Sequence, residues 1–165
     1  MAVSNSSLLG ANFAATGTTQ LFALGTRTNA TDGSVWEYVE ATATQTTGSL
    51  VSLTPRSTAF TFLTAFAVLT QNAIDIGAFQ GIISQGEFGW VAKQGRSLYV
   101  KATGTIAAGA GVGLSAGGGR LEIASAVAVN FTLFGIYVTT SASTGTASVA
   151  VATLTWPRVA ASVGA

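Results

Sequence analysis

The chain has 165 residues, of which 48% are hydrophobic and only 8% charged, and its formal net charge is +1. This length suits one domain with its own core. The sequence contains neither cysteine nor histidine, which excludes thiol nucleophiles, Ser-His-Asp triads, zinc fingers and haem ligation through these residues. A surface with so little charge provides weak electrostatic repulsion between copies, so the composition favours a protein that assembles.

The first 19 residues are mostly Ala, Ser, Thr, Asn and Gly, with three scattered large apolar side chains, Leu8, Leu9 and Phe13. Neither the strand period nor the helix period holds across residues 1–19. One interpretation is a disordered terminus. The other, which we favour, is an extended arm whose apolar residues dock on a neighbouring subunit. After this arm we predict a β domain over 20–158 and a small apolar C-terminal tail over 159–165.

A strand is predicted over 35–43, which is rich in β-branched and aromatic residues and follows an Asp-Gly turn signal. Its two faces are mixed, because Glu37 and Glu40 fall on opposite sides of it. Mixed faces indicate that both sides contact protein, and another copy of the chain is one such partner. Together with the arm residues Leu8, Leu9 and Phe13, Trp36 and Tyr38 are therefore candidate residues for contact with a neighbouring subunit.

The rest of the chain predicts short strands separated by glycines. A strand over 50–53 precedes the segment 60–69, which fits strand and helix periods alike, although its Phe and Thr content favours a strand. Three hairpins are expected in the glycine-punctuated part: 90–93 with 97–101 around Gln94-Gly95, 112–115 with 120–124, and 131–139 with 146–155. This pattern predicts an all-β fold, a Gly-rich barrel or sandwich of short antiparallel strands with an extended N-terminal arm.

Two details are expected of the last hairpin. The segment 131–138 is apolar at both alternating sets of positions, so we expect burial on both faces. The dipeptide Trp156-Pro157 is expected to end the final strand, because proline cannot continue a hydrogen-bonded ladder.

Two glycine motifs resemble catalytic or cofactor signatures. Gly113–Gly117 matches the G-x-S-x-G nucleophile elbow, which requires a histidine that the chain lacks. Gly111–Ala116 fits a dinucleotide fingerprint, but neither a following helix nor an acidic residue at the right distance is predicted. We therefore interpret these glycines as hairpin and bulge positions, and expect no catalytic residues, no cofactor and no metal.

The charged residues point to no specific ligand. Glu37 and Glu40 cannot face one another across a sugar, although a glycosidase pair built from distant acids stays open. A basic-aromatic cluster occurs over 88–101, but no basic stripe accompanies it, so we expect no nucleic acid partner. The apolar stretches 59–69 and 121–138 are too short or too polar for a membrane span. The start of the chain also lacks the basic segment of a secretory signal.

Several glycine-based motifs together resemble those of small structural proteins of tailed-phage virions. Phe88-Gly89-Trp90-Val91 with Lys93-Gln94-Gly95 is similar to their F-G-W-V-x-x-x-G stretch. Further matches are Leu24–Arg27 with Asp32–Val35 at the opening, Ala107–Gly111 with Gly117–Gly119, and Phe134–Ile136 with Val149–Val151. The resemblance covers most of the chain.

The resemblance implies a capsid decoration (cement) protein, a β-rich domain that is commonly trimeric and clamps the head shell from outside. The implied partners are further copies of the chain, in a homotrimer, and the major capsid protein. The implied location is the outer surface of the virion capsid, with no catalytic residues to carry over. The alternatives are a phage tail or fibre component and a carbohydrate-binding adhesin domain, with a glycosidase more remote.

Overall fold

The computed structural model describes residues 11–53, 58–61, 75–114, 120–123, 131–140 and 148–161. Within these ranges the regular structure is entirely β, so the predicted all-β class is confirmed. Among the same residues, no helix is long and apolar enough to cross a membrane. The strands are β1 (Arg27–Asn29), β2 (Val35–Ala41), β3 (Leu50–Leu53), β4 (Thr58–Thr61), β5 (Asp75–Phe79), β6 (Phe88–Ala102), β7 (Val112–Leu114), β8 (Leu121–Ile123), β9 (Phe131–Thr140) and β10 (Ser148–Ala161).

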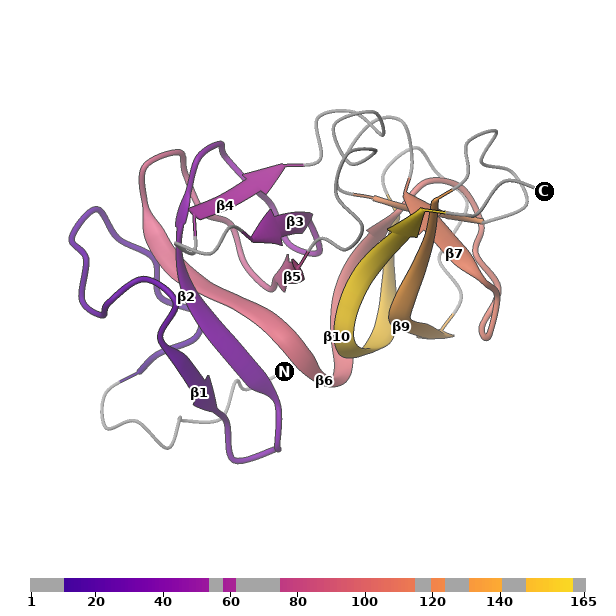
Figure 1. Ribbon diagram of the computed structural model, residues 1–165, viewed down its shortest axis with the longest axis horizontal. Coiled ribbons are helices and arrows are strands. Elements are labelled where there is room, and N and C mark those ends of the chain that lie inside the picture. The colour runs from indigo at the N-terminus through magenta and orange to yellow at the C-terminus, as the bar shows by residue number, and fades with distance from the viewer. Residues whose placement is uncertain are drawn as a thin grey trace.

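The strands gather in two halves that share the long strand β6 (Figure 1). In the first half β2 pairs with residues 88–94 of β6, and in the second half β10 pairs with residues 94–102. The strand pairings that would close each half into a barrel involve few residues. The β2–β4 pairing joins two residue pairs, and the β6–β8 and β7–β9 pairings each join one. The sheet is therefore not closed into a barrel, and that alternative was wrong.

The hairpin predicted around Gln94-Gly95 is also wrong, because β6 runs through both residues as one 15-residue strand. At this point β6 changes partner from β2 to β10, so the chain kinks without reversing. Gly95 has a φ of 151°, and a Cβ placed on it would lie 2.8 Å from the Cβ of Ser34. The glycine thus permits a close approach of the β1–β2 turn. In the sequence, a glycine that forms a turn cannot be distinguished from a glycine that allows close packing.

The other two predicted hairpins are confirmed as antiparallel pairs, β7 with β8 and β9 with β10. Their connecting turns lie outside the described residues. β3 has the predicted bounds 50–53, and β2 covers most of the strand predicted over 35–43. Of the ambiguous segment 60–69, only residues 60 and 61 are described, as the end of β4.

Pro157 does not end the last strand. The ladder between β9 and β10 pairs Leu154 with Ile136 and then Arg158 with Phe134, so three residues of β10 bulge against the single residue Gly135. A proline is tolerated in such a bulge because no ladder hydrogen bond from its nitrogen is required. The strand then continues to Ala161.

The same bulge changes which residues of β9 face the core. Leu133, Ile136 and Val138 are buried, whereas Phe134 and Tyr137 are 50% and 60% exposed. A bulge shifts the alternation of inward and outward side chains along a strand. The buried position before Gly135 is therefore odd-numbered, Leu133, and those after it are even-numbered, Ile136 and Val138. The expectation that 131–138 is buried on both faces was therefore wrong.

The apolar residues form two clusters on opposite faces of β2 and β6. The larger cluster runs through both halves and contains Trp36, Tyr38 and Trp90. The smaller cluster contains Val39 and Val91 and lies between β2, β3, β5 and β6. Residues of the same chain thus bury both faces of β2. This burial accounts for the mixture of apolar and charged residues on each face without contact with a second copy of the chain.

Candidate functional site: an aromatic groove beside a charged stripe

Three of the predicted contact residues belong to the core of their own chain. Phe13, Trp36 and Tyr38 are each 5% exposed or less. The ring of Phe13 stacks on Trp36 with centroids 4.7 Å apart and meets Trp90 edge-on at 5.5 Å. These contacts correct the prediction for the three aromatic residues, which are not available to a partner at the surface. Leu8 and Leu9 lie outside the described residues.

The described part of the predicted arm packs against the sheet. Ala11 is 4% exposed, and the backbone of Gly17 exchanges two hydrogen bonds with that of Phe88, with N–O distances of 3.1 and 2.8 Å. These bonds extend the sheet by one bridge beyond its named strands. Residues 11–17 are therefore part of the folded body.

An open groove of about 580 Å³ lies at the β9–β10 bulge, a volume typical of small-ligand sites. Its lining combines three aromatic side chains with charged and backbone groups: Asp75, Phe134, Gly135, Tyr137, Thr155, Trp156, Pro157 and Arg158. The aromatic side chains are 42–60% exposed. Because burial of a large apolar side chain is favourable by roughly 1.5–3 kcal/mol, a cluster left in water indicates an interaction surface.

The bulge and two cations fix Trp156 in this groove. Its φ is 52°, a conformation that costs a non-glycine residue about 1–3 kcal/mol and persists only where the surroundings enforce it. The guanidinium carbon of Arg27 lies 5.1 Å from the ring centroid, and the Lys93 amine nitrogen lies 5.8 Å from it. Both distances suit cation–π attraction. Trp156 therefore presents a preformed surface.

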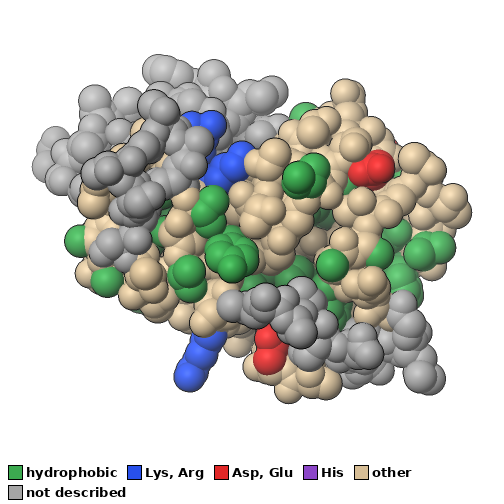
Figure 2. Space-filling model, turned by 180° about the vertical axis from the view of Figure 1, so that it is seen from behind, with side chains coloured by type: hydrophobic (Ala, Val, Ile, Leu, Met, Phe, Trp, Pro, Cys, Tyr) green, Lys and Arg blue, Asp and Glu red, His purple; other side chains and the backbone are tan. Residues whose placement is uncertain are grey.

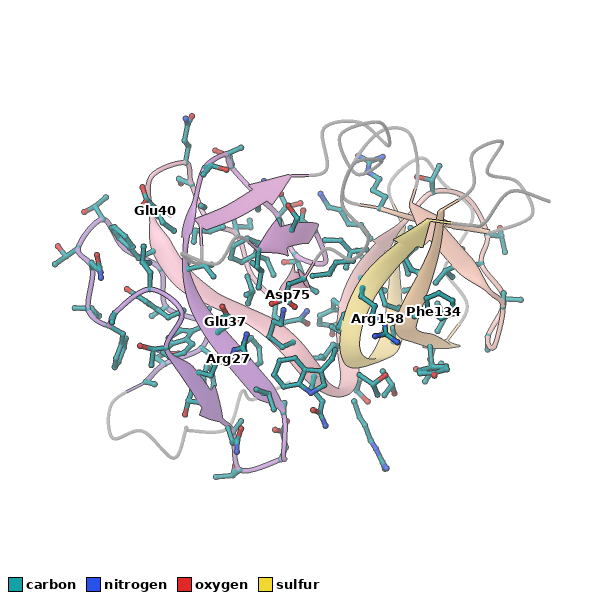
Figure 3. The ribbon with its side chains drawn as sticks, viewed as in Figure 1. Arg27, Glu37, Glu40, Asp75, Phe134 and Arg158 are labelled. Carbon is teal, nitrogen blue, oxygen red and sulfur yellow. The ribbon has the colours of Figure 1, made fainter. Side chains whose placement is uncertain are left out.

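Beneath Trp156, four charged side chains form a stripe across one face of the neighbouring strands β1, β2, β6 and β5. The stripe consists of Arg27, Glu37, Lys93 and Asp75. Figure 3 shows Arg27, Glu37 and Asp75 close together, whereas Glu40 lies well away from them.

The four charges are joined by ion pairs. Arg27 Nε donates to Glu37 Oε2 at 2.9 Å, and Arg27 Nη2 lies 3.6 Å from Asp75 Oδ2. The Lys93 amine donates to Asp75 Oδ1. Burial lowers the pKa of Lys93, and the hydrogen bond and charge of Asp75, followed by the charge of Glu37, oppose that shift. Two cations therefore balance two anions at the edge of the groove.

The groove can bind by stacking and hydrogen bonding. Among the described residues, no group of three or more Asp, Glu, His or Cys is placed to hold a metal ion. Sequence reasoning missed Phe134, Tyr137, Trp156 and Asp75 as site residues. The available signals were the Phe-Gly pair at 134–135 and the Trp-Pro pair at 156–157, which together form the two sides of the bulge.

A scan against protein-family models found no match to this chain, nor did searches of curated proteins and of solved structures.

Proposed function

We propose that this chain is a structural protein of a tailed-phage virion, a capsid decoration (cement) protein that binds adjacent capsid subunits and stabilises the head. Its partners are the major capsid protein and further copies of itself, in a homotrimer on the outer surface of the capsid. The observation that carries the proposal is the aromatic surface formed by Phe134, Tyr137 and Trp156, exposed on a chain with a net charge of only +1.

The surface of the described part supports attachment through apolar contacts. Figure 2 shows hydrophobic side chains in several groups over one face, with few charged side chains among them. Burying each aromatic side chain of the groove contributes roughly 1.5–3 kcal/mol before ordering costs. One such contact is weak, but copies linked in a trimer on a repeating lattice gain affinity through their effective concentration.

The proposal is tested by the number of copies in purified virions of the phage that encodes the chain. A copy number matching that of the major capsid protein, or a simple fraction of it, is expected. A handful of copies per particle would instead assign the chain to the tail or a fibre. Light scattering after size exclusion tests the homotrimer, and a monomeric mass would contradict that part of the proposal.

A carbohydrate-binding adhesin is a second candidate, favoured by the polar groups of the same groove. The Asp75 carboxylate and the Arg158 guanidinium lie beside the aromatic rings, and Figure 3 shows Arg158 next to Phe134. Aromatic faces can stack on the C–H faces of a sugar while charged groups bind its hydroxyls, which is the arrangement of apolar walls with few polar groups found in ligand sites. Retention on saccharide columns that is lost in Trp156→Ala would favour this candidate, and no retention would reject it.

A further inference from the structure

Lys93 is the largest side chain in the described part of the chain with almost no exposed surface. Lysines are rarely buried, because removing an ammonium group from water costs several kcal/mol even when it is paired. A buried lysine that contacts a carboxyl group is therefore a candidate for chemistry as well as for structure.

The strand register brings two carboxyl groups to the two sides of this amine. Val91 on β6 pairs with Glu37 on β2 and with Phe79 on β5. Lys93 shares a face of β6 with Val91, and Asp75 shares a face of β5 with Phe79, because side chains two residues apart point to the same side. Lys93 therefore lies on the central strand, with Asp75 on one neighbouring strand and Glu37 on the other.

We propose that Lys93 and Asp75 form an intramolecular amide bond between Nζ and Cγ, with Glu37 as the proton-transfer group. The proposal is independent of the proposed function. It is based on the direct contact of the amine with Asp75 Oδ1, the complete burial of Lys93, and the 5% exposure of the Glu37 side chain. The lowered pKa of Lys93 favours the neutral amine, which is the nucleophilic form.

The reaction is a condensation that releases one water molecule. A proton first passes from the Lys93 ammonium to the Asp75 carboxylate, which leaves a neutral amine and a carboxylic acid. Nζ then attacks Cγ, and the negative charge develops on Oδ2, beside the Arg27 guanidinium. Glu37 takes the proton from Nζ and returns it to the Oδ1 hydroxyl, which leaves as water. One C–N bond forms, one C–O bond breaks, and no oxidant is required.

The surroundings suit this step. Trp156 lies over Lys93, with the ring centroid 5.8 Å from Nζ, and shields the amine from bulk water. The Asp75 side chain is 44% exposed, so the released water can leave through the groove. The amide also replaces a buried ammonium by a neutral group, which removes the desolvation cost of that charge.

Intact-mass spectrometry of the purified full chain tests the proposal directly. The expected mass is lower than the sequence mass by one water molecule. Cleavage after glutamate at Glu87 separates Asp75, in fragment 41–87, from Lys93, in fragment 88–122. The proposal predicts that these two fragments stay joined. A chain with its full sequence mass would overturn the proposal, and so would a water loss located in fragment 1–37, as a succinimide at Asp32-Gly33 would produce.

Three variants separate the roles of the residues. Lys93→Met is expected to restore the full mass, and Glu37→Gln is expected to slow the linkage or abolish it. Glu40→Gln removes a carboxylate from the same strand at a position remote from the stripe (Figure 3), so it is expected to keep the water loss. Linkage at the wild-type rate in Glu37→Gln would contradict the role assigned to Glu37.

Discussion

Gly135 on β9 faces Trp156 on β10 across a bulge in which both residues have positive φ, 79° and 52°. This relationship sets the exposed surface of the second half of the sheet. It turns Phe134 and Tyr137 toward solvent and holds Trp156 beside them. The groove is therefore a consequence of the backbone at these two positions.

Gly135→Ala is expected to destabilise the fold. A Cβ at this position would lie 2.5 Å from the carbonyl oxygen of Thr155, and the φ of 79° disfavours any side chain. Together the clash and the backbone strain cost at least about 2 kcal/mol. Urea denaturation measures the change. Gly81→Ala is the control, because a Cβ there meets nothing within 4 Å, and equal stabilities of the two variants would contradict the role of the bulge.

Phe13→Ala is expected to lower the free energy of unfolding by about 3–5 kcal/mol, the usual result of truncating a buried aromatic side chain. The reason is the packing of Phe13 between Trp36 and Trp90. Leu21→Ala removes a side chain that is 73% exposed and should change stability by less than about 0.5 kcal/mol. An unchanged stability of Phe13→Ala would contradict this packing and would favour the arm predicted from the sequence, whose apolar residues dock on a neighbouring subunit.

Much of the fold could be predicted because strand-forming residues and Gly-rich turns are local signals. β2, β3 and the pairing of β9 with β10 follow from such signals. The errors came from partners distant in the sequence. The sequence predicts a turn at Gly95, but β6 passes from β2 to β10 at this residue, and only the register of the distant strands distinguishes a kink from a reversal.

The site was less predictable than the fold for the same reason. Because residues 1–19 have no period, the sequence predicts that Phe13 belongs to an arm that docks on a neighbouring subunit, yet Phe13 completes an aromatic cluster built from β2 and β6 of its own chain. In the sequence, Lys93 lies in the basic-aromatic cluster over 88–101, which points to no specific ligand. Its contact with Asp75 depends on the pairing of β5 with β6, for which the sequence carries no local signal.

Asp32→Asn is expected to reduce the loss of stability in acid. Hydrogen bonds from the Ser34 hydroxyl and backbone amide, at 2.6 and 2.9 Å, lower the pKa of Asp32. A carboxyl group whose pKa is lower when folded stabilises the protein above the unfolded pKa of about 3.9. That contribution is lost as the pH falls through the folded pKa. The group is largely exposed, so the effect is small.

The measurement is the urea midpoint at neutral pH and near pH 3, compared between wild type and Asp32→Asn. The midpoint of the wild type should fall further than that of the variant. Glu40→Gln controls for the removal of one acidic charge elsewhere on the chain. An equal fall in wild type and Asp32→Asn would show that the Ser34 hydrogen bonds make no difference to acid stability.

The central claim, attachment to a capsid through the aromatic surface, is tested most directly by binding to head shells that lack this protein. Wild type is compared with the double variant Phe134→Ser, Tyr137→Ser and with Ile82→Ser, which alters another exposed apolar side chain. The account predicts full occupancy for wild type and Ile82→Ser in high salt as well as low, and loss of most occupancy for the double variant with an unchanged circular dichroism spectrum. Full occupancy by the double variant would contradict it.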